Sequence, residues 1–222
     1  MTRFIASRSR LLAAIGLVLA LGLAALPLGM WISPGDDLSA RIGREAIWWA
    51  LGAFVLVWIV RVERLPLRSI GLRALRFKGV AWGVIAAIAM MATVMLSYAV
   101  IFPALGLQMN MKQVRSLTHV PLWLQTATMV RAGVVEEIIF RGYAIERIAM
   151  LTGSRWAGAL LSAAAFIAVH ISSWGYAQLI VVAFGAAILT ALYLYRRDLG
   201  SNMLAHFLTD FVGFMLARLQ GG

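Results

Sequence analysis

This chain of 222 residues contains no cysteine and few acidic residues. Without a thiol it forms no disulfide, offers no thiolate ligand to a metal and has no cysteine nucleophile. Aspartate and glutamate number 9 against 20 lysines and arginines, and charged residues make up only 13% of the chain. Hydrophobic residues reach 62%, and the mean hydropathy is +0.88. This composition indicates an integral membrane protein.

Apolar stretches of roughly 17 to 25 residues recur along the sequence, and a helix needs that length to cross a bilayer core of about 30 Å. They predict an all-α fold, a polytopic transmembrane bundle of about seven helices in contact with membrane lipid. The expected spans are 11–31, 46–60, 80–102, 121–145, 156–172, 176–195 and 202–219. We divide the chain into residues 1–120, with three helices and a basic cytoplasmic loop at 61–79, and residues 121–222, with four helices.

Basic residues orient this bundle, because short cytoplasmic loops collect lysine and arginine. They are concentrated in the leader MTRFIASRSR, in the 61–79 loop and in the fourth and sixth connections. We therefore expect a cytoplasmic N-terminus and an extracytoplasmic C-terminus. The leader is similar to the start of a secretory signal, but no clear cleavage site follows, so we expect a retained anchor.

The net charge of +11 is dispersed over loops of one face, without clustered aromatics, so no nucleic-acid partner is expected. The 61–79 loop alternates apolar residues with arginines. It can lie flat on anionic headgroups or form an ordinary solvated loop.

Two adjacent acids and an arginine lie within the fourth expected helix, in the stretch AGVVEEIIFRGY. A charged residue at the centre of a bilayer helix costs roughly 2.5 to 3.5 kcal/mol, so Glu136, Glu137 and Arg141 indicate a site. On an α-helix Glu137 and Arg141 share a face, whereas Glu136 points elsewhere. We expect Glu137 and Arg141 to form an ion pair that supports the site, and an unpaired Glu136 to be the candidate general base. A purely structural ion network is the alternative.

The fifth and seventh expected helices supply imidazoles and a further acid. Phe166 and His170 are one turn apart, so the phenyl ring can pack beside the imidazole. His206 and Asp210 also lie four residues apart, and such a pair can orient an imidazole or bind a metal. Each pair alone could serve packing, but three helices that each direct an acid or imidazole inward favour a site.

A glutamate with two histidines and an aspartate can activate water in two ways. The groups can act as acid and base, or His170, His206 and Asp210 can hold a Zn²⁺ whose bound water loses a proton near about pH 7. Both routes lead to hydrolysis. With no cysteine and no obvious serine nucleophile, attack of water on an amide is the economical mechanism. The expected substrate is a peptide or protein, and no organic cofactor is expected.

Three motifs then resemble a known family: Glu-Glu-x-x-x-Arg at Glu136, Glu137 and Arg141, Phe-x-x-x-His at Phe166 and His170, and His-x-x-x-Asp at His206 and Asp210. In this order they resemble the CPBP family. That family comprises the type II CAAX prenyl endopeptidases and the bacteriocin-processing or immunity proteins, also called Abi. The resemblance covers about residues 122–216.

The resemblance implies an intramembrane protease whose active site is a cavity among the last four helices. By carry-over, Glu136 activates water with His170, while His206 and Asp210 bind or stabilise the oxyanion. Zinc has been argued both ways for the family, so a metalloprotease is one of two options. Asp210 departs from the eukaryotic pattern, which typically has asparagine there. Because an ionised aspartate cannot donate to an oxyanion, Asp210 needs a proton, a metal or an orienting role.

The expected helix boundaries conflict with a single site. A fifth helix that begins near Trp156 at the cytoplasmic face carries His170 about 21 Å along its axis, near the outer surface. Glu136 and His206 lie nearer the inside. The clusters converge only if the fifth helix starts beyond the bilayer, tilts strongly, or is displaced by a long fourth helix.

Two other functions stay open at the level of the sequence. One is a non-catalytic scaffold or bacteriocin-immunity protein of the same fold, and the other is a small proton-coupled transporter with Glu136 and His170 in a relay. The high alanine, leucine and arginine content favours a GC-rich bacterial genome and therefore the bacterial inner membrane. A peptide, a pheromone-like precursor or a membrane-protein terminus is then favoured over a prenylated CAAX substrate. The sequence predicts no oligomeric state.

Overall fold

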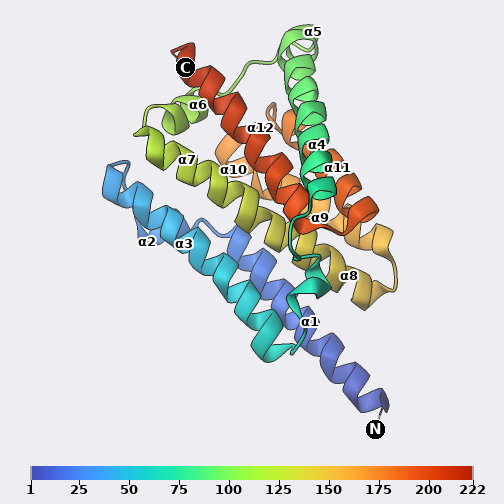
Figure 1. The fold of residues 1–222 in the computed structure, drawn as a ribbon. Coiled ribbons are helices and arrows are strands. Elements are labelled where there is room, and N and C mark those ends of the chain that lie inside the picture. The colour runs from blue at the N-terminus through green and yellow to red at the C-terminus, as the bar shows by residue number, and fades with distance from the viewer. Residues whose placement is uncertain (1, 222) are drawn as a thin grey trace.

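The computed structural model describes the backbone of residues 2–221 and the side chains of residues 9–221. The side chains of Arg3 and Arg8 in the basic leader lie outside the described set. Helices make up most of residues 2–221, and no strand occurs among them. This confirms the all-α membrane bundle. The N-terminal end of α1 and the C-terminal end of α12 lie at opposite ends of the bundle, which is the arrangement that seven expected spans would give (Figure 1).

Long helical rods run through the bundle, and several of them consist of consecutive segments. In chain order the elements are α1 (Thr2–Ala25), α2 (Leu28–Ile32), α3 (Leu38–Val57), η1 (Trp58–Val62), η2 (Leu67–Ile70), α4 (Phe77–Leu96), η3 (Ser97–Ile101), α5 (Phe102–Ala104), α6 (Met111–Thr118), α7 (Leu122–Arg131), η4 (Ala132–Ala144), α8 (Ile145–Thr152), α9 (Arg155–Val169), α10 (Ile171–Trp174), α11 (Leu179–Arg196) and α12 (Leu199–Leu219). Of the η segments, η2 is a 3₁₀ helix and the others are π-helical.

Each expected span overlaps one of these rods, but the bounds differ: the first runs beyond the end of α1 at Ala25 into the separate α2, and the second starts eight residues after α3 begins at Leu38. Four rods in the described chain are long and apolar enough to cross a membrane: Leu38–Val62, Phe77–Ala104, Arg155–Trp174 and Leu179–Arg196. A shorter apolar segment covers Ser9–Ala25 within α1. The rod that contains η4 and the α12 rod carry all the acids of the expected site and His206, and these polar residues lower the mean hydropathy of both rods. The short α6 was not expected.

The rod formed by α7, η4 and α8 lies between α3 and α12 (Figure 1). Every residue of η4 except Val134 is buried. The rod ends at Thr152, seven residues beyond the expected end. Gly153 stops it with a left-handed φ of 76°, a conformation that glycine adopts without steric cost. The Ser154 side chain then accepts a hydrogen bond from the Ala157 amide and caps α9.

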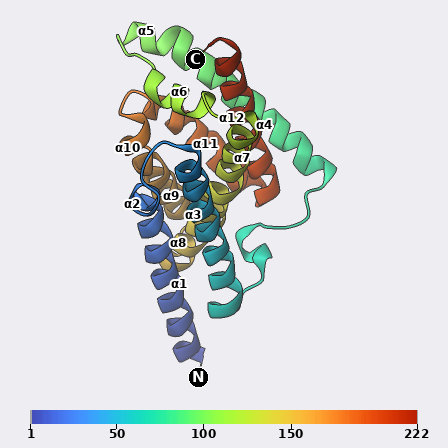
Figure 2. The ribbon, with the colours of Figure 1, turned by 90° about the vertical axis from the view of Figure 1, so that its left-hand side faces the viewer.

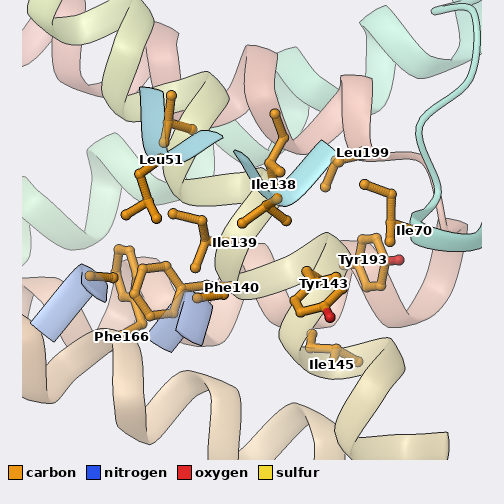
Figure 3. Packing of buried hydrophobic residues seen from close by; sticks show 14 of the residues in the cluster. Leu51, Ile70, Ile138, Ile139, Phe140, Tyr143, Ile145, Phe166, Tyr193 and Leu199 are labelled. Carbon is orange, nitrogen blue, oxygen red and sulfur yellow. The ribbon is translucent and has the colours of Figure 1, made fainter. Parts of the chain in front are cut away.

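Small residues allow this central rod to approach its neighbours closely. The sequence predicts such a contact from Ala132 and Gly133, one turn before the acids. A Cβ at Gly133 would lie 3.0 Å from the Met203 carbonyl oxygen of α12, which confirms the expectation. Farther along η4, Phe140 packs edge to face against Phe166 of α9, with the ring centroids 5.2 Å apart (Figure 3).

The 61–79 connection divides into two parts. Figure 2 shows α1 and α3 side by side, with the connection leading from them to α4. Ile70 is fully buried, and the Leu199 amide donates to the Gly71 carbonyl at 3.0 Å, so the first part packs on the bundle. Leu75 and Phe77 are exposed. Only this second part fits a segment that lies on headgroups.

Candidate active site

Glu137 is the fully buried centre of a polar network between the central rod and α12. Its Oε1 accepts from Arg141 Nη1 at 2.9 Å and lies 2.9 Å from His206 Nδ1. Its Oε2 accepts from Asn202 Nδ2 at 3.3 Å. The expected pair of Glu137 with Arg141 is therefore confirmed. Because both oxygens of this carboxylate are occupied, Glu137 is placed to support the site rather than to receive a proton.

Glu136 is not unpaired, and the sequence-based expectation on this point is wrong. Arg131 Nη1 donates to Glu136 Oε1 at 2.8 Å. The expectation assumed an α-helix, in which residues five apart do not face each other. The backbone of η4 is π-helical, with hydrogen bonds that span five residues instead of four, so Arg131 and Glu136 come onto one face.

His170 lies directly after α9, and its ring is held from two sides. Nδ1 lies 2.7 Å from the Phe166 carbonyl oxygen, and the two ring centroids are 4.5 Å apart. A neutral imidazole therefore carries its proton on Nδ1, donates it to this carbonyl, and keeps Nε2 as an acceptor. Nε2 lies 4.0 Å from Glu136 Oε2.

His206 on α12 is oriented in a corresponding way. Its Nδ1 donates to Glu137, and its Nε2 faces Asp210 Oδ2 at 3.5 Å. The His206 side chain is buried, while Asp210 is partly exposed. The two expected imidazoles thus each have Nδ1 fixed by a buried oxygen, which leaves Nε2 of each ring for the site.

The length of the central rod resolves the conflict over His170. Glu136 lies about 24 Å back from the end of the rod at Thr152, and His170 lies about 22 Å along from the start of α9 at Arg155. Because a tight turn joins the end of α8 to the start of α9, Glu136 and His170 lie at the same height along the bundle. Of the three possibilities, the long fourth helix accounts for the convergence.

Phe166 fills the space between the two imidazoles. Besides its contact with His170, its ring lies 6.2 Å from the His206 ring, centroid to centroid. The Arg141 guanidinium lies over the same ring at 4.0 Å. A cation over a buried aromatic face contributes about 0.5 to 2 kcal/mol. The structure therefore brings the expected site residues of all three motifs together around this ring.

The expected zinc ligands are not arranged as one set. His206 Nε2 faces Asp210, whereas His170 Nε2 faces Glu136. In the part of the chain that the structure describes, no three histidine, aspartate or glutamate side chains are placed to hold a metal ion. A zinc site takes at least three protein ligands around one point. Zinc stays a prediction for this chain, and no step below passes through it.

Sequence reasoning missed three residues that contact the site. Asn202 precedes His206 by four positions, so the spacing that identified His206 and Asp210 could have identified it as well. Arg131 was not identified because the sequence reasoning assumed an α-helix, in which Arg131 and Glu136 do not share a face. Glu45 on α3, whose Oε2 accepts from Arg131 Nε at 3.1 Å, lies far away in the chain, and no local signal points to it.

Residues 117–212 match the family described as type II CAAX prenyl endopeptidase Rce1-like. The matched segment begins shortly before the central rod and ends within α12. It contains all the residues of the three motifs, whereas Glu45 lies outside it. Comparisons with curated proteins and with solved structures gave no significant match.

Proposed function

Because residues 117–212 belong to the Rce1-like family of type II CAAX prenyl endopeptidases, we propose that this membrane protein is an intramembrane endopeptidase. Its substrate is a membrane-associated peptide or the terminus of a membrane protein. The bond hydrolysed is an amide, and water is the nucleophile. The membrane location follows from the four long apolar helices and the family.

The gap between Glu136 and His170 carries this proposal. The 4.0 Å between Oε2 and Nε2 is too long for a direct hydrogen bond and suits a water molecule that contacts both atoms. Glu136 Oε1 is occupied by Arg131, so Oε2 is the oxygen that can receive a proton. His170 Nε2 accepts a second hydrogen bond from the same water and thereby orients the lone pair of the water oxygen.

The reaction then follows from the placement of these groups. The water oxygen attacks the scissile carbonyl carbon while Glu136 removes a proton. The imidazole of His206, in its protonated form, is held at Nδ1 by Glu137 and donates from Nε2 to the oxyanion, while Asp210, 3.5 Å from Nε2, keeps the ring in place. The C–N bond breaks, and the proton held by Glu136 passes to the leaving amine. The products are one new carboxyl group and one new amine.

The test is cleavage of a peptide library by the purified protein in liposomes. Glu136→Gln and His206→Ala are expected to lower the rate about 10²- to 10⁴-fold. Glu63→Gln is the matched control, because Glu63 is also buried and paired, with Arg147 at 2.7 Å, but lies outside the site. Full cleavage by Glu136→Gln would contradict the hydrolytic mechanism.

The library contains the same peptides with and without a C-terminal prenyl group. The composition favours a bacterial inner membrane with the N-terminus in the cytoplasm, so unprenylated peptides are expected to be cleaved. Cleavage of the prenylated forms alone would contradict this choice of substrate. Proton-coupled flux without a product peptide would support a transporter instead.

A further inference from the structure

Glu136 is held by a contact that reaches outside the family-matched segment. Arg131 donates from Nη1 to Glu136 Oε1 at 2.8 Å and from Nε to Glu45 Oε2 at 3.1 Å. Glu45 belongs to α3, which ends at Val57, 60 residues before the matched segment begins at residue 117. One guanidinium thus links the candidate base to a glutamate on an N-terminal helix.

Each member of this link is fixed by further contacts. Glu45 Oε1 accepts from the Thr128 hydroxyl at 2.9 Å, so both of its oxygens have donors on α7. The Trp48 ring, one turn along α3 from Glu45, lies 5.2 Å from the Arg131 guanidinium carbon. The side chains of Arg131, Glu45 and Glu136 are only 11%, 17% and 12% exposed.

The geometry of the guanidinium makes Glu45 relevant to Glu136. An arginine side chain has several rotatable bonds, but its planar head presents N–H groups in a rigid fork. When Nε is fixed by Glu45, the direction of Nη1 is fixed as well. Nη1 then holds Oε1 of Glu136 and leaves Oε2 toward His170. Loss of Glu45 would release the head of Arg131, and with it the orientation of the carboxylate.

We infer that Glu45 is a positioning residue for the proposed hydrolysis, which acts through Arg131 to aim Oε2 of Glu136 at the water position. The inference rests on the proposed function. Glu45 contacts no reacting atom, so it affects how often Glu136 is correctly placed rather than how the substrate binds. A displacement of about 1 Å at a reacting group can cost up to about 10²-fold in rate.

A merely structural role predicts a different outcome, and the chain offers a matched pair to measure it. Glu63 and Arg147 also join the N-terminal helices to the central rod, at the other end of the bundle, with side chains 4% and 3% exposed. Glu63→Gln and Glu45→Gln each remove one charge from a buried pair and keep the shape. Both are expected to lower the unfolding temperature.

The experiment measures kcat and KM separately in liposomes, at a temperature where every variant is folded. Glu45→Gln is expected to lower kcat about 10- to 100-fold and to leave KM within about twofold. Glu63→Gln is expected to leave kcat unchanged. Glu45→Asp keeps the charge and is expected to retain more activity than Glu45→Gln. Arg131→Lys, which keeps the charge but loses the fork, gives a second test if Glu45→Gln does not fold.

A double variant decides whether Glu45 acts through Arg131. If it does, adding Glu45→Gln to Arg131→Gln lowers kcat no further, whereas independent effects multiply. Cleavage that is lost in Glu136→Gln but normal in Glu45→Gln overturns this inference alone. Full cleavage by Glu136→Gln overturns the proposed function and the inference with it.

Discussion

Glu137→Gln tests the division of labour between the two adjacent acids. Glu137 is completely buried and accepts hydrogen bonds from Arg141, His206 and Asn202. Glutamine keeps the shape of the side chain and removes its charge. The Arg141 side chain is only 1% exposed and loses its one ion-pair partner among the described residues. The change therefore leaves a cation without compensation inside the bundle.

The expected cost follows from that burial. Removal of one partner of a buried ion pair destabilises a protein by about 3 to 5 kcal/mol, because the remaining charge stays desolvated. In a chain of this size each kcal/mol lowers the unfolding temperature by about 2 to 4 °C, which gives a total of about 6 to 20 °C. Stacking of Arg141 on Phe166 at 4.0 Å is present with and without the carboxylate, so it does not change this difference.

The assay is thermal unfolding in detergent, followed by circular dichroism. Glu146→Gln is the control, because Glu146 pairs at 2.6 Å with Arg197, whose side chain is 47% exposed. Solvent screens that pair, so its loss is expected to cost less than about 1 kcal/mol. Equal unfolding temperatures for Glu137→Gln and the wild type would refute the claim that Glu137 supports the site.

Three further predictions concern α12 and the metal. Asp210→Asn keeps an acceptor for His206 and is expected to retain most of kcat, whereas Asp210→Ala is expected to lower it about 10- to 100-fold; equal rates would contradict the orienting role. Gly133→Val is expected to lower stability by about 1 to 3 kcal/mol in thermal unfolding, since its Cβ meets α12, whereas Gly22→Ala has open space and serves as the control. Dialysis against a zinc chelator separates the two routes to activated water: an unchanged cleavage rate is expected for the acid–base route proposed above, and a loss that added zinc restores would support the predicted metal.

The rods and the three motifs could be predicted from the sequence because both depend on local patterns. Apolar length identifies a helix that crosses the membrane, whatever surrounds it. The spacing of four residues placed Glu137 beside Arg141 and His206 beside Asp210, and the structure confirms both contacts. These statements need only the geometry of one helix at a time.

The ion-pair partner of Glu136 and the height of His170 along the bundle could not be predicted from local patterns. Arg131 reaches Glu136 because η4 is wound as a π-helix, and no residue type in AGVVEEIIFRGY signals that winding. His170 reaches Glu136 because the central rod continues to Thr152 before Gly153 ends it. Glycine at position 153 is a visible stop signal in the sequence, whereas the expected span, set by apolar length, ends at residue 145.

Buried charges in this bundle form two rows of alternating sign, and the rows explain why only one of the acids is available for chemistry. The first row runs through Glu45, Arg131 and Glu136 and ends at the neutral imidazole of His170. The second row runs through Arg141, Glu137, protonated His206 and Asp210. Alternation keeps each ion beside an opposite partner, which offsets part of its desolvation cost.

The rows differ in how completely the central acid is satisfied. In the second row both oxygens of Glu137 accept hydrogen bonds from fixed donors. In the first row Glu136 Oε1 is held, while Oε2 has His170 at 4.0 Å. The pairing of Glu136 with Arg131 Nη1 leaves Nε of the same guanidinium in a buried position, where it needs an acceptor. Glu45 supplies that acceptor from α3, and an N-terminal helix thereby completes the hydrogen bonding of the arginine that holds Glu136.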